Sequence, residues 1–159
     1  MKLYIKNKLI SWGGDSFVTN EAGENVYAVK GNVFSFTRKK KIKDMDGNVL
    51  YTVRNKLFNF FFAKAYIYDA EGRRIAKVTH DGLLGFKLVG FEDDVRLSRS
   101  FGLSKDILKN GEVIGKMSYQ ITVVRDAFEL EINDKEDVPF FVALVIAIDN
   151  MRDKDRSDR

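Results

Sequence analysis

A repeat of about 24 residues is the feature of this sequence that most constrains its fold. Four stretches share one pattern, in which a polar start is followed by two apolar residues, a small or polar residue and an aromatic residue: 6–12, 30–36, 54–60 and 80–86. The closing aromatic residues lie 24, 24 and 26 residues apart and are Trp12, Phe36, Phe60 and Phe86. A fixed period of this length indicates one structural unit that is used several times.

A glycine turn keeps the same period. The turn glycines lie 11, 11 and 12 residues after the first three closing aromatics and are Gly23, Gly47 and Gly72. The dipeptide Asp46-Gly47 predicts a type I′ hairpin turn, in which both central residues need positive φ, and Asn110-Gly111 repeats that signal. Each repeat is therefore expected to be a strand, a turn and a returning strand.

The stretches between the turns alternate between apolar and polar residues. A period of two is typical of strands with one buried and one solvated face. About five or six such hairpins fit before residue 134, and closure of so long a sheet would remove its exposed edges. The residues expected on the buried faces of these strands are Val49, Tyr51, Val53, Val95, Leu97, Phe101, Val113, Gly115, Met117, Tyr119, Ile121, Val123, Phe128, Leu130 and Ile132.

One apolar run, at 138–148, predicts a buried helix. Asp137 can cap its N-terminus, and Pro139 is tolerated in a first turn. A helix with no polar face must be covered on every side, which a barrel of hairpins would do. At ~1.5 Å per residue the run spans about 17 Å, too short for a bilayer core of ~30 Å, so no transmembrane segment is expected. The alternative is a central strand, because short apolar runs are ambiguous. The core-forming side chains expected on this helix are Phe140, Phe141, Leu144, Val145 and Ile148.

Length and composition predict one cytoplasmic domain. A chain of 159 residues fits one domain, expected at 1–150, with a charged, disordered tail at 151–159. The absence of cysteine excludes disulfides and cysteine–metal sites and suits a reducing compartment. Lys6 and Lys8 interrupt the first apolar stretch, so no signal peptide is expected.

Three segments in the same order resemble the LURP-one-related family of the tubby C-terminal-like superfamily. The opening K-N-K-L-I-S-W-G-G-D-S-F-V-T-N-E-A-G is similar to the family's first hairpin, and D-M-D-G-N-V-L-Y-T-V is similar to its second. The stretch I-N-D-K-E-D-V-P-F-F-V-A-L-V-I-A-I-D is similar to its core helix. The resemblance covers about residues 2–150. It implies a twelve-stranded antiparallel barrel around the helix, with no enzyme activity. Tubby domains proper bind phosphoinositide headgroups through basic side chains, and none of their binding residues is carried over to this chain.

The most basic segment contains Arg38, Lys39, Lys40, Lys41 and Lys43. In a strand, Lys39, Lys41 and Lys43 share one face, and Arg38 and Lys40 share the other with Ile42. Clustered Lys and Arg near an anionic surface contribute about 1 kcal/mol each, so the segment predicts a site for anionic headgroups. The alternative is a solvated edge strand whose lysines discourage aggregation.

An aromatic run, Phe60, Phe61 and Phe62 with Phe58 before it, is a second candidate contact. These side chains cannot all face one side of a strand, which suggests a loop tip that contacts a membrane or a partner. The alternative is a bend that is buried on both faces.

The only histidine, His80, lacks a nucleophile and an orienting partner in the sequence, so no catalytic residue is expected. No metal or other cofactor is expected either.

These features together favour a non-catalytic binding module that docks on anionic phospholipid or on a membrane surface. The alternative is a protein-interaction or scaffold domain with no lipid ligand, since loops on a rigid barrel can present themselves to a protein partner. Nucleic acid is not an expected partner, because 27 basic and 23 acidic residues leave a net charge of only +4.

Overall fold

The chain folds into twelve strands and one helix over the residues that the computed structural model describes, which are 1–6, 15–31, 39–55, 63–98, 102–120 and 127–157. The strands are β1 (Lys2–Lys6), β2 (Asp15–Asn20), β3 (Asn25–Gly31), β4 (Lys40–Lys43), β5 (Val49–Asn55), β6 (Ala65–Tyr68), β7 (Arg74–Asp81), β8 (Gly85–Val89), β9 (Val95–Leu97), β10 (Ser104–Lys109), β11 (Glu112–Gln120) and β12 (Ala127–Ile132). The helix is α1 (Val138–Ser157).

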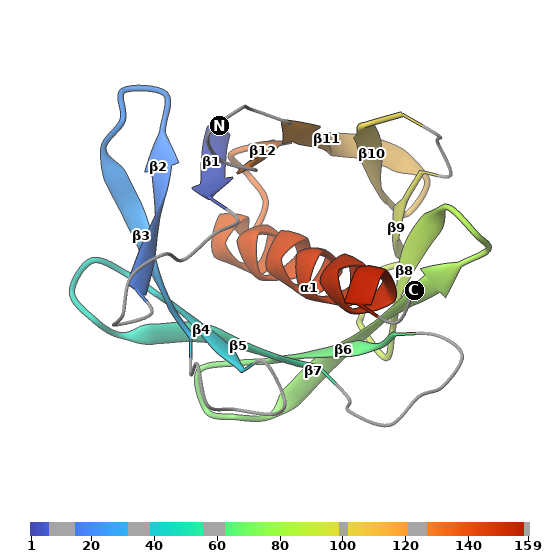
Figure 1. Cartoon of the computed structure of the whole chain (residues 1–159), viewed down its shortest axis with the longest axis horizontal. Coiled ribbons are helices and arrows are strands. Elements are labelled where there is room, and N and C mark those ends of the chain that lie inside the picture. The colour runs from blue at the N-terminus through green and yellow to red at the C-terminus, as the bar shows by residue number, and fades with distance from the viewer. Residues whose placement is uncertain (7–14, 32–38, 56–62, 99–101, 121–126, 158–159) are drawn as a thin grey trace.

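The strands form a closed antiparallel barrel in chain order. Each strand pairs with the next one, and β1 closes the barrel against β12, where Leu3 lies opposite Leu130. Figure 1 shows α1 running through the space that the strands enclose. Closure leaves no unpaired sheet edge, which explains how a long antiparallel sheet avoids edge-to-edge association. The predicted fold class, a mainly-β barrel of hairpins around a C-terminal helix, is confirmed.

The sequence repeat corresponds to one turn that is built three times. At residues 44–48, the Asp44 N–H donates to the Asn48 carbonyl (3.0 Å) and the Gly47 N–H donates to the Asp44 carbonyl (3.2 Å). The Asp44 carboxylate also accepts from the Asn48 N–H (2.8 Å). The same three bonds occur at residues 20–24 and 69–73. A short polar side chain at the first position thus closes each turn on its own backbone.

The turn at Asp46-Gly47 differs from the sequence prediction. Gly47 has φ of 91°, whereas Asp46 is not among the described residues with positive φ. The predicted type I′ turn at this position is therefore wrong. The loop at residues 44–48 is closed by the hydrogen bonds of Asp44 instead, and in this loop only Gly47 needs a positive φ. At Asn110-Gly111 both residues have positive φ, 52° and 88°, as a type I′ turn requires.

A β-bulge accompanies four of the hairpins. The pairing register shifts so that one residue of the returning strand has no partner, at Val26, Leu50, Ile75 and Ile114. Ile114 packs against the core, while Val113 is 63% exposed. The predicted inward position of Val113 is therefore wrong. The extra residue reverses the alternation, and this reversal is invisible to a strict period of two.

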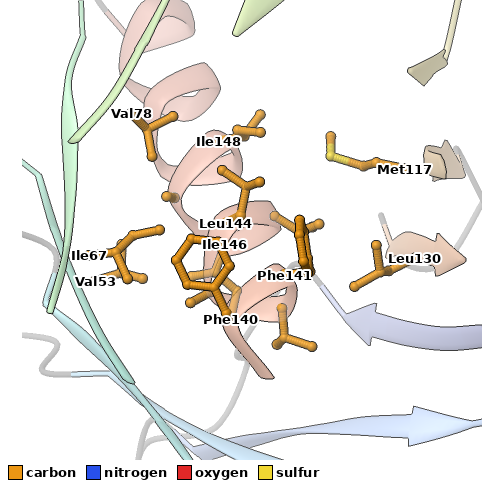
Figure 2. Packing of buried hydrophobic residues seen from close by; sticks show 14 of the residues in the cluster. Val53, Ile67, Val78, Met117, Leu130, Phe140, Phe141, Leu144, Ile146 and Ile148 are labelled. Atoms are coloured by element: carbon orange, nitrogen blue, oxygen red, sulfur yellow. The ribbon is translucent and has the colours of Figure 1, made fainter. Parts of the chain in front are cut away.

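The helix fills the barrel. Phe140, Phe141, Leu144, Val145 and Ile148 are each at most 2% exposed, which confirms the predicted core helix and excludes the alternative of a central strand. Figure 2 shows Phe140 on the side of Val53 and Ile67, and Phe141 on the side of Met117 and Leu130. Opposite walls of the barrel are thus packed against opposite sides of one helix.

Asp137 caps the start of α1. Its carboxylate accepts from the Phe140 N–H (3.2 Å), and its carbonyl accepts from the Phe141 N–H (3.2 Å). The Tyr51 hydroxyl of β5 donates to the same carboxylate. Burial, with Asp137 as a second cause, raises the pKa of Tyr51 above its ordinary range, so Tyr51 stays a hydrogen-bond donor. The predicted helix cap is confirmed, and it also ties the helix to the barrel wall.

The end of the helix corrects a prediction. A disordered tail is expected at 151–159, but α1 continues to Ser157. Asn150 and Met151 are 1% and 0% exposed, and the Arg152 guanidinium lies 4.9 Å from the centre of the Tyr119 ring. Burial and this cation–π contact hold residues 150–152 against the barrel, which a compositional argument for disorder cannot anticipate.

We expect Leu144→Ala to lower the free energy of unfolding by about 2–5 kcal/mol, because the cavity left inside the barrel cannot be refilled. Val113→Ala removes a largely exposed side chain and should change stability by less than about 0.5 kcal/mol. Urea unfolding of the two variants and the parent chain measures both values. Equal effects of the two substitutions would contradict the central position of α1.

Gly115 is required by close packing rather than by its backbone conformation. A Cβ atom at this position would overlap the Glu131 carbonyl oxygen and lie 2.8 Å from the Ile132 Cδ1 atom. Gly115→Ala is therefore expected to cost about 1–3 kcal/mol. Gly72 has open space around it but φ of +81°, so Gly72→Ala should cost about 1 kcal/mol through strain alone. Thermal unfolding of both variants measures the two losses. A smaller loss of stability in Gly115→Ala than in Gly72→Ala would be inconsistent with the β11–β12 register.

Candidate functional site

Positive charge is concentrated on one wall of the barrel. Within strands β3 to β8, all of which the structure describes, Asp81 is the only acidic residue. Alternate residues of a strand face outward, and nearly all of the Lys and Arg residues of these strands are at outward-facing positions. We call the outward set, together with the residue just before β4, the basic face: Lys30, Lys39, Lys41, Lys43, Arg54, Arg74, Lys77 and Lys87.

Strand register brings like charges together in the basic face. Lys41 lies opposite Lys30 on β3 and opposite Thr52 on β5. Burial, and next the positive charges of Arg54 and Lys41, lower the pKa of Lys39 below its ordinary value. Like charges on neighbouring strands repel, so a bound anion would relieve a repulsion that the fold itself imposes.

Two tyrosines position the arginines of the basic face. The Arg54 guanidinium lies 5.3 Å from the centre of the Tyr68 ring, and the Arg74 guanidinium lies 5.3 Å from the centre of the Tyr66 ring. A guanidinium over an aromatic ring keeps its N–H groups at its edges, where they can bind phosphate or carboxylate oxygens in pairs. The two contacts therefore orient the arginines without neutralising them.

Five lysines of this wall have no counter-ion within the part of the chain that the structure describes. No described acidic group forms an ion pair with the lysines of β4 to β8 that face outward, Lys41, Lys43, Lys77 and Lys87, or with Lys39. The opposite wall differs. Lys2 lies 3.1 Å from Glu129 and 2.9 Å from Glu131, and Lys109 lies 2.8 Å from Glu136. Hydrogen bonding to Lys2 lowers the pKa of Glu131, as expected of a satisfied pair.

Lys40 lies apart from the basic face. It has the inward parity of Ile42, and its Nζ atom lies 4.0 Å from the Oδ2 atom of Asp149 on α1. The Lys40 and Asp149 side chains are 20% and 8% exposed. This pair joins the barrel wall to the last part of the helix, so it serves the fold rather than an outside ligand.

The other predicted site residues have mixed outcomes. The structure brings Lys39, Lys41 and Lys43 to one wall, as the strand periodicity indicates. Arg38 and the aromatic run at 60–62 lie outside the described residues. The sequence analysis does not identify Arg54, Arg74, Lys77 and Lys87, because they come from strands far apart in the chain. The outward alternation of Arg54, Lys77 and Lys87, with only Asp81 for an acid, was the available signal. Arg74 lies opposite Tyr68 because of the bulge at Ile75, which the alternation does not reveal.

Two other features are absent from the described residues. They contain no group of three or more His, Cys, Asp or Glu side chains that could hold a metal ion. They also contain no helix that is both long enough and apolar enough to cross a membrane.

The fold and the surface together define a class of protein, a closed twelve-stranded barrel around a central helix with cations gathered on its outer wall. The chain matches the sequence model of the LURP-one-related family over residues 1–149, and it therefore belongs to that family. No curated protein and no solved structure matches it. The resemblance noted from the sequence segments is thus confirmed at the level of the family.

The opposite orientations of Lys40 and Lys41 can be tested by a matched pair of substitutions. Lys40→Met leaves the buried Asp149 carboxylate without this cation, so we expect a loss of about 1–3 kcal/mol in the free energy of unfolding. Lys41→Met removes an outward charge and should change stability by less than about 0.5 kcal/mol. Chemical denaturation measures both, and a loss confined to Lys41→Met would contradict the inward position of Lys40.

Proposed function

We propose that this protein is a non-catalytic module that docks on anionic phospholipid surfaces through the basic face. The observation that carries the proposal is the segregation of charge: outward cations on strands β3 to β8, with Asp81 as the only acid in those strands. A surface of this kind gains most from a partner that offers many negative charges in one plane. An anionic membrane leaflet is such a partner.

The size of the effect is sufficient for reversible docking. Each Lys or Arg held near an anionic leaflet contributes roughly 1 kcal/mol. Several cations acting together would therefore bind vesicles in the micromolar to millimolar range. Arg54 and Arg74 add a preference for phosphate, since their guanidinium groups can donate to two oxygens at once. The cytoplasmic leaflet is the anionic one, which places the proposed docking in the cytoplasm.

Vesicle co-sedimentation of the whole chain tests this function. The test variant is Lys41→Glu/Lys43→Glu, in the basic face, and the matched control is Lys116→Glu/Lys135→Glu, which makes the same change in net charge at exposed sites elsewhere. We expect the parent chain to bind phosphatidylserine-containing vesicles and not phosphatidylcholine alone. The test variant should bind at least tenfold more weakly, while the control changes by less than about threefold.

Salt separates this mechanism from apolar adsorption. Binding through exposed charges should weaken as ionic strength rises from about 0.05 M to 0.5 M, because the Debye length shortens. Equal binding to neutral vesicles, or equal losses in the test and control variants, would refute docking through the basic face. A single saturable protein partner, captured without lipid, would instead support the scaffold alternative.

A further inference from the structure

A cavity lies at the opposite end of the barrel from the start of α1, where β6 begins and β7 ends. Its volume is about 390 Å³, and its lining includes Ala63, Lys64, Thr79, His80, Gly82 and Leu83. Ligand pockets in proteins measure about 300–1,000 Å³, and an apolar cavity of about 150 Å³ already admits benzene. The space is therefore large enough for a small organic ligand.

The wall of the cavity is mainly apolar. Ala63 is 3% exposed, so its methyl group belongs to the interior. The His80 ring lies against the Phe86 ring, with centroids 5.0 Å apart, and presents an aromatic surface. At the turn between β7 and β8, Leu83 is 91% exposed. A leucine held in water beside an apolar cavity is typical of an entrance that an apolar group covers when it binds.

One cation lies in this lining. Lys64 is half-buried and forms no ion pair or hydrogen bond with any residue that the structure describes. The described lining contains no carboxylate. Asp81 lies in sequence between the lining residues His80 and Gly82, and its Oδ2 atom is 3.9 Å from an Arg96 nitrogen, so it already has a cation beside it. An apolar space whose described lining holds one ammonium group and no carboxylate matches a ligand that has a hydrocarbon part and one negative charge.

We propose that this cavity binds a fatty acid, with the hydrocarbon chain inside and the carboxylate held by Lys64. The site is distinct from the basic face, and the proposal does not rest on vesicle docking. A headgroup bound at the outer wall meets several cations and no enclosed apolar space. A fatty acid bound here meets one cation and an apolar enclosure, so the two ligands are distinguished by where their binding energy comes from.

Chain length gives the first test. Isothermal titration calorimetry of the whole chain with hexanoate, octanoate, decanoate and dodecanoate should show one saturable site. Affinity should rise by about fourfold or less for each added methylene and then level off when the cavity is full. A rise that continues without a plateau indicates adsorption to an open apolar surface and would overturn the proposal, as would the absence of saturable binding.

Two variants test the two parts of the ligand separately. Lys64→Glu should weaken decanoate binding at least tenfold while leaving 1-decanol within about threefold of the parent chain. Lys116→Glu makes the same charge change at an exposed site on β11 and should leave both ligands within about threefold. Ala63→Leu fills the cavity and should weaken both ligands at least tenfold.

A surface variant keeps the test valid if Ala63→Leu does not fold. Leu83→Ser changes an exposed side chain, so the barrel should keep its stability, and both ligands should bind about three- to tenfold more weakly. The matched control is Leu103→Ser, which removes another exposed leucine, 54% exposed, outside the described lining. Equal decanoate affinity in Lys64→Glu, Leu83→Ser and the parent chain would refute the site. Vesicle docking can fail while decanoate still binds in the cavity, and decanoate binding can fail while vesicle docking is observed.

Discussion

The burial of an apolar helix on every side is the constraint on which the rest of this structure depends. Residues from Phe140 to Ile148 have no polar face to offer to water, so α1 is stable only inside a closed wall. The wall closes when β1 pairs with β12, which joins the two ends of the sheet. Asp137 then serves both parts, since it caps the helix and accepts from Tyr51 on the wall.

Because the helix occupies the interior, the two binding sites proposed for this molecule lie on the outer wall and at one end of the barrel. The interior itself changes along the helix, from the aromatic packing around Phe140 to the buried polar groups Asp149 and Asn150. Lys40 reaches inward to that polar end, while Lys41, one residue later, faces out. A strand only four residues long thus contributes to the core and to the proposed docking surface at the same time.

Local patterns predicted the fold well and failed where a longer-range contact overrides them. The glycine turns and the core helix follow from periodicity and composition, which act over a few residues. Val113 was misplaced because a bulge at Ile114 reverses the alternation, and a bulge has no strong sequence signal. Residues 151–157 of the expected tail are helical, and Arg152 there meets Tyr119, a contact between residues 33 positions apart.

The sequence by itself determined the class of fold, the helix that the barrel encloses, the family and the presence of a basic segment near residue 40. All of these depend on short-range spacing. Tertiary structure alone decided which cations share a wall, because sheet register places Lys41 beside Lys30 and brings cations from five strands to one surface. It also decided that Lys64 lies beside an apolar cavity. A site assembled across strands exists only once the strands are paired, and pairing is a property of the whole barrel.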